Sequence, residues 1–146
     1  MPETHFRPKP GRYGVQCVTT STGPITAPTA NVTTTYFLPT PRRKSRVARV
    51  SVSVLVVPVD ADGTLLATLK KRDNLNAADV TLSSALDLEA LVTKTPTALT
   101  FLTTLTDGQL TLQEGDQLFV EIVSNSAAID TALTQGFLVS ELLFLE

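Results

Sequence analysis

The sequence predicts an all-β protein: an antiparallel β-sandwich of about eight strands, resembling a jelly roll, preceded by an extended, proline-rich N-terminal arm. Apolar residues alternate with a period of two in several segments after Arg46, which is typical of strands. Turn residues such as Asp and Gly separate most of these segments, as in sandwiches and barrels. With 146 residues and 42% apolar content, the chain can form one domain with a buried core. We expect residues 1–30 to form the arm and residues 31–146 the sandwich.

The arm is defined by its prolines, because seven of the nine lie at or before Pro41. Proline removes a backbone donor and biases the preceding residue toward an extended conformation. Such a segment is either disordered or ordered by lying across another surface. The segment Asn31–Leu38 is rich in β-branched and aromatic residues, and we expect it to be a first strand.

Three alternating segments define the centre of the predicted sandwich. Residues 50–57 (VSVSVLVV), 64–70 (TLLATLK) and 117–123 (QLFVEIV) each place every second side chain on one face. The predicted core residues on these faces are Val52, Val54, Val56, Leu65, Leu69, Leu118, Val120 and Ile122.

Further strands are expected toward the C-terminus. Leu99–Leu105 and Leu110–Leu112 flank Asp107-Gly108, a dipeptide that favours a type I′ hairpin. Glu114–Asp116 predicts a turn before the strand at residues 117–123. Residues 136–146 (GFLVSELLFLE) are apolar on both faces, which predicts a strand that is central or lies in an interface.

Two segments fit more than one structure. Val80–Val92 fits a strand, but Ser84 and Asp87 also have the spacing of a helix capping box. Ser126–Gln135 has apolar residues at helical spacing and fits a loop equally well.

Few residues could support catalysis or metal binding. His5 and Cys17 both fall in the arm, and the chain has no cluster of Cys and His at zinc-ligand spacing and no phosphate-binding glycine motif. Asp60–Gly63 is expected to be a turn, with a surface calcium site as the alternative. No apolar run approaches the ~20 residues that span a membrane. We therefore expect a protein that is not an enzyme, carries no cofactor and does not span a membrane.

Charge is distributed unevenly along the chain. Residues 1–50 carry eight Lys or Arg against Glu3, a net of +7, whereas residues 51–146 carry four against thirteen Asp or Glu, a net of −9. The basic run Arg42–Arg49 fits a solvated linker, a contact with an acidic protein surface or a contact with nucleic acid. No aromatic residues interleave with it, and an acidic domain repels phosphates, so nucleic acid is the least favoured of the three.

The stretches TTYFLPTPRRKSRVARVSVSVLVVPVDADGTLLATLKK and LTDGQLTLQEGDQLFVEIVSNSAAIDT carry a resemblance in overall pattern. They resemble small jelly-roll proteins of bacteriophage virions, which decorate or cement capsids or form the base of head fibres. Gly115-Asp116 before an apolar strand also resembles trimeric tumour-necrosis-factor-like and collagen-globular-domain-like sandwiches. The resemblance implies a non-catalytic assembly module on the virion surface, made in the host cytoplasm, with a major capsid protein or another virion protein as its partner.

These observations lead to a specific hypothesis about binding residues. We expect the arm and basic run to dock on the partner through Phe6, Tyr13, Tyr36, Phe37, Arg42, Arg43, Lys44, Arg46 and Arg49. We expect a homotrimer whose interface contains Phe137 together with Leu138, Leu142 and Phe144, which share one apolar face of the last strand. The alternative is that the arm or Ser126–Gln135 covers the second apolar face. The alternatives are a receptor-binding or carbohydrate-binding sandwich of a tail or fibre, and a nucleic-acid-binding barrel.

Overall fold

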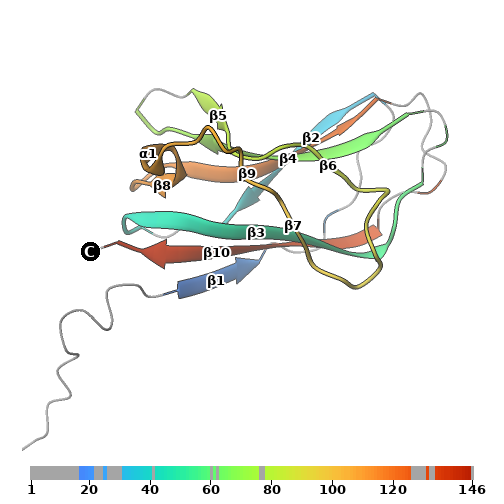
Figure 1. Ribbon diagram of the computed structural model, residues 1–146, viewed down its shortest axis with the longest axis horizontal. Coiled ribbons are helices and arrows are strands. Elements are labelled where there is room, and N and C mark those ends of the chain that lie inside the picture. The colour runs from blue at the N-terminus through green and yellow to red at the C-terminus, as the bar shows by residue number, and fades with distance from the viewer. Residues whose placement is uncertain are drawn as a thin grey trace, which may run out of the picture.

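The computed structural model in Figure 1 consists of two stacked antiparallel sheets, which confirms the predicted all-β sandwich. It describes residues 17–21, 25, 31–40, 42–59, 61, 63–75, 78–125, 131 and 134–145. Within these residues there is one short helix, α1 (Asp107–Leu110). The strands are β1 (Cys17–Ser21), β2 (Thr33–Leu38), β3 (Ser45–Val56), β4 (Leu65–Arg72), β5 (Asp79–Thr81), β6 (Leu86–Asp87), β7 (Thr97–Ala98), β8 (Thr111–Leu112), β9 (Gln117–Ser124) and β10 (Thr134–Phe144).

The strand order is that of a jelly roll. One sheet has the order β1-β10-β3-β7, with β8 also on β3, and the other has β2-β9-β4-β5, with β6 also on β4. If β5 with β6 and β7 with β8 are each counted as one interrupted strand, the orders become 1-8-3-6 and 2-7-4-5. Eight strand positions wound in this way match the expected count for this fold.

The core lies between the inner faces of the two sheets. The alternation in β3 buries Val50, Val52 and Val54, and all of the other predicted core residues except Val56 are also buried. Val56 is 40% exposed because it pairs with Thr134 at the last position of the β3–β10 ladder, where the sandwich ends. The prediction for Val56 is therefore wrong, since the alternation continues past the end of the opposite sheet.

A β-bulge divides β3 into two parts. Glu141 pairs with Arg49 and Leu142 pairs with Val47, so Ala48 is left over on β3. The bulge keeps Val47 and Val50 both in the core although they are three residues apart. It also places Ala48 and Arg49 consecutively on the exposed side.

The segment between β4 and β9 differs from several predictions. Val80–Val92 contains most of β5, all of β6 and no helix, so the strand alternative is the correct one. Leu99–Leu105 is not a strand, because it crosses between the sheets. The backbone N–H of Leu99 donates to Val50 of one sheet, and Phe101 forms a bridge with Ser83, which lies beside the other sheet. Asp107-Gly108 does not form a hairpin turn. It begins α1, where the backbone N–H of Thr106 donates to Gln109 Oε1 at 2.8 Å and closes a helical turn.

The predicted arm contributes to the sandwich. β1 pairs with the outer edge of β10, and Ile25 is buried and bridges to Gly136. β3 occupies one edge of β10 and residues 17–21 occupy the other. The boundary expected between residues 30 and 31 therefore lies inside the fold. Some predictions concern residues that the structure does not describe, namely His5, Asp60, Asp62 and most of Ser126–Gln135. The calcium site considered at Asp60–Gly63 is among them.

Candidate functional site

The predicted basic run separates into three environments. Arg42, Arg43 and Lys44 are exposed on the connection from β2 to β3. Arg46 forms an ion pair with Asp107 of α1, with 2.8 Å between Nη2 and Oδ1. Arg49 lies farther along β3, on the outer face of its sheet. The structure therefore keeps three of the five cations together, and we call Arg42–Lys44 the basic loop.

The basic loop is fixed at both ends. On one side, Thr40 Oγ1 donates a hydrogen bond to the backbone carbonyl of Asp116 at 3.2 Å. On the other side, the backbone N–H of Leu145 donates to the carbonyl of Lys44 at 3.0 Å. The Arg43 guanidinium lies 5.3 Å from the centre of the Phe144 ring, within the range of a cation–π contact. The three adjacent cations thus lie between a side-chain hydrogen bond of Thr40 and a backbone hydrogen bond of Lys44.

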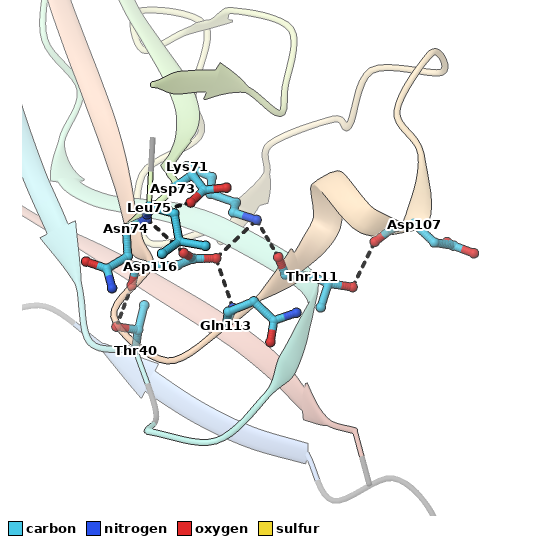
Figure 2. Close-up of polar contacts among 9 residues, drawn as sticks. All are labelled: Thr40, Lys71, Asp73, Asn74, Leu75, Asp107, Thr111, Gln113 and Asp116. Atoms are coloured by element: carbon cyan, nitrogen blue, oxygen red, sulfur yellow. Dashed lines mark hydrogen bonds and ion pairs between the residues drawn. The ribbon is translucent and has the colours of Figure 1, made fainter. Parts of the chain in front are cut away.

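The anchor on the Thr40 side is part of a buried polar cluster around Asp116, shown in Figure 2. The Asp116 carboxylate is 3% exposed and accepts hydrogen bonds from the backbone N–H groups of Asn74 at 3.0 Å and Gln113 at 2.9 Å. Lys71 points inward from β4, with its Nζ 3.1 Å from Asp116 Oδ2 and 2.6 Å from the carbonyl of Thr111. These partners come from three segments, so the cluster joins the end of β4, β8 with the turn before β9, and the connection that leads to the basic loop.

The cluster keeps Asp116 ionised. Burial by itself raises the pKa of Asp116, but the N–H groups of Asn74 and Gln113 and the Lys71 ammonium together lower it below its usual range. The neighbouring Gly115 has φ +89°, and an added Cβ would lie 2.5 Å from Asn74 Nδ2. Gly115-Asp116 lies in the predicted turn. The positive φ favours Gly at position 115, and the cluster needs the carboxylate of Asp116 as an acceptor.

The predicted aromatic anchors do not form one group. Phe6 and Tyr13 lie outside the described residues. Tyr36 is half-buried on the inner face of β2 and packs against the core, which limits the part of its ring that a partner could contact. Phe37 is on the outer face, 51% exposed, with its ring centre 5.5 Å from that of Phe119.

The predicted oligomer interface is also corrected. Leu138 and Leu142 are fully buried in the core, because they pair with Val52 and Val47 of β3 and share their inward face. Phe144 is half-buried under Arg43. Phe137 remains accessible, 42% exposed on the opposite, outer face of β10. Of the four predicted interface residues, Phe137 is therefore the one that lies on the accessible outer face.

A groove of about 330 Å³ lies on this outer face of β3 and β10. Its lining residues are Arg49, Ser51, Ser53, Pro96, Val139 and Glu141. Sequence reasoning missed Glu141, although its position two and four residues after Val139 and Phe137 marks the same face of a strand.

No group of three or more metal-ligating side chains occurs among the described residues. The described part of the chain also has no helix long and apolar enough to cross a membrane. The chain matches no protein-family model, no curated protein and no solved structure.

Proposed function

We propose that this protein is a non-catalytic assembly subunit that decorates or cements a bacteriophage capsid and docks through its basic loop on an acidic surface of a virion protein. The observation that carries the proposal is the anchored loop with Arg42, Arg43 and Lys44, for which the described residues provide no ion-pair partner. The fold supports the proposal, since jelly rolls are common in viral capsid proteins, although a fold alone does not define a function.

The contrast with four other cations of the chain supports a docking function. Arg46, Lys70, Lys71 and Arg72 all have acidic partners within this chain. An exposed ion pair contributes little affinity, but several like charges at one place steer a partner of opposite charge and fix its orientation. The basic loop is thus suited to orient the subunit, while apolar contacts supply most of the binding energy.

The carbohydrate-binding alternative is weaker, because the groove on the outer face of β3 and β10 has no aromatic ring in its lining. Ligand pockets usually combine apolar or aromatic walls with a few polar groups. The nucleic-acid alternative is disfavoured because the segment after residue 50 carries a net charge of −9.

The proposal is tested by binding the purified protein to particles that lack it, measured by co-sedimentation at several salt concentrations. The variant Arg42→Gln, Arg43→Gln, Lys44→Gln should weaken binding at least tenfold at low salt, and less as salt screens the charges. A truncation that removes residues 1–16 and keeps β1 tests the arm separately.

Lys94→Asn is the matched control. It removes an exposed cation near the other end of β3, where the backbone N–H of Lys94 donates to the carbonyl of Val54. Val54 lies about 30 Å along the strand from Ser45. Asn suits the positive φ of 60° at this position. Unchanged particle binding by the basic-loop variant, or equal losses in both variants, would contradict the proposal.

A further inference from the structure

The outer face of β3 and β10 carries two rows of residues that complement each other. The register places Phe137 opposite Ser53, Val139 opposite Ser51 and Glu141 opposite Arg49. These six side chains point away from the core, since their neighbours Val50, Val52, Leu138 and Leu142 are buried. Large apolar residues on β10 therefore lie beside small polar residues on β3, and an acid lies beside a base.

The size difference gives this face its shape. Ser51 and Ser53 form a low floor along β3, and Val139 and Pro96 flank it, which leaves the groove of about 330 Å³. Phe137 is 42% exposed beside that groove, and Leu55, two residues beyond Ser53 on the same face, is 41% exposed. The face thus presents a ridge on β10 next to a groove on β3.

The charged pair at the other end of the face is not closed. Arg49 and Glu141 are directly opposite in the register, yet among the described residues neither has an ion-pair partner within 4.0 Å. Cross-strand neighbours of opposite charge normally attract each other. Both side chains line the groove, where they are available to a partner.

We propose that this face binds a second copy of the chain in a two-fold dimer. An axis parallel to the strands, between β3 and β10, places the β10 row of each copy over the β3 row of the other. Phe137 and Val139 then enter the serine-floored groove of the second copy, and Glu141 meets its Arg49. The two-fold repeats every contact, so one surface supplies both ridge and groove and both charges.

The self-complementary charges favour a second copy over an unrelated partner. A partner of uniform charge would be attracted by Arg49 and repelled by Glu141, or the reverse, whereas a second copy satisfies both. Removing Phe137, Leu55 and Val139 from water provides the driving force, and the ion pairs fix the register. The inference is independent of the basic loop, which lies beyond the start of β3.

The test is sedimentation equilibrium of the full chain over a micromolar concentration range. The wild-type protein should form a dimer, and Phe137→Ser should raise its dissociation constant at least tenfold. Arg49→Glu and Glu141→Arg should each weaken the dimer, because each substitution places like charges together at two symmetric sites. The double variant Arg49→Glu, Glu141→Arg should recover at least half of the change in log Kd that the weaker-binding single variant shows relative to the wild type.

Leu75→Ser is the control for exposed apolar surface. Leu75 is 90% exposed on the β4–β5 connection, so this variant should dimerise as the wild type does. Thermal unfolding of every variant separates loss of association from loss of fold. A monomeric wild type, a trimer, a dimer unaffected by Phe137→Ser, or a double variant no better than the single ones would each overturn the proposal.

Discussion

The clearest test of the structure is the substitution Asp116→Asn in the buried polar cluster. Asn has nearly the same shape as Asp, so the substitution removes charge and replaces one acceptor oxygen by an NH₂ group. That NH₂ would face either a backbone N–H or the ammonium of Lys71, all of which are donors. Lys71 would keep its hydrogen bond to the carbonyl of Thr111. Its charge, however, would lose the Asp116 counter-ion in a site where the Lys71 side chain is 8% exposed.

The magnitude follows from this burial. Removing one partner of a buried ion pair costs roughly 3–5 kcal/mol, and the remaining Thr111 contact places this site near the lower limit, at about 3 kcal/mol. A loss of that size lowers the unfolding temperature by about 10 °C in a domain of this length. Urea unfolding followed by far-ultraviolet circular dichroism measures the free energy, with an unchanged m value showing that the fold is intact.

The pH dependence gives a second readout. The pKa of Asp116 is lower in the folded chain than in the unfolded chain, where it is about 3.9. Its stabilising contribution is therefore complete above pH ~4 and is lost as the pH falls below that value toward the folded pKa. The gap in stability between wild type and Asp116→Asn should be widest at neutral pH and should shrink in acid.

Lys71→Met is the matched partner variant. It leaves the carboxylate with two backbone donors, and the double variant should lose less than the sum of the single losses, because Lys71 and Asp116 interact directly. A cost below about 1 kcal/mol for Asp116→Asn, or a gap that persists unchanged in acid, would refute this account of the cluster.

Three further predictions concern stability. Gly115→Ala should cost about 1–3 kcal/mol in urea unfolding, because its φ of +89° is strained for Ala and the new Cβ would meet Asn74; a neutral result would show that the turn relaxes freely. Leu82→Ala should cost about 2–5 kcal/mol, since Leu82 is fully buried, whereas the exposed Leu75→Ala should cost less than about 0.5 kcal/mol; similar losses would contradict the assigned burial. Removal of residues 1–30 should destabilise the chain more than removal of residues 1–16, because only the longer truncation takes away β1 and the buried Ile25; equal effects would place the fold boundary elsewhere.

The sequence determined the fold class and most of the long strands. The period-two alternation in residues 50–57, 64–70 and 117–123 identified β3, β4 and β9, because a strand at a sheet face buries every second residue. The turn at Gly115-Asp116 could also be predicted from the sequence, since few residues other than Gly adopt the positive φ of position 115. The clustering of Arg42, Arg43 and Lys44 likewise follows from their adjacency in the chain.

Tertiary structure alone decided which apolar face of β10 is internal. One face carries Leu138 and Leu142 and the other carries Phe137 and Val139, and both faces are apolar, so the alternation could not show which one is buried. Pairing with β3 places Leu138 beside Val52 and Leu142 beside Val47, in the core. Only the fold could show that Asp107 starts a helical turn and holds Arg46, or that Lys71 points inward to meet Asp116. Local patterns report the period of a strand, but which face is buried and which charges meet depend on residues tens of positions apart in the chain.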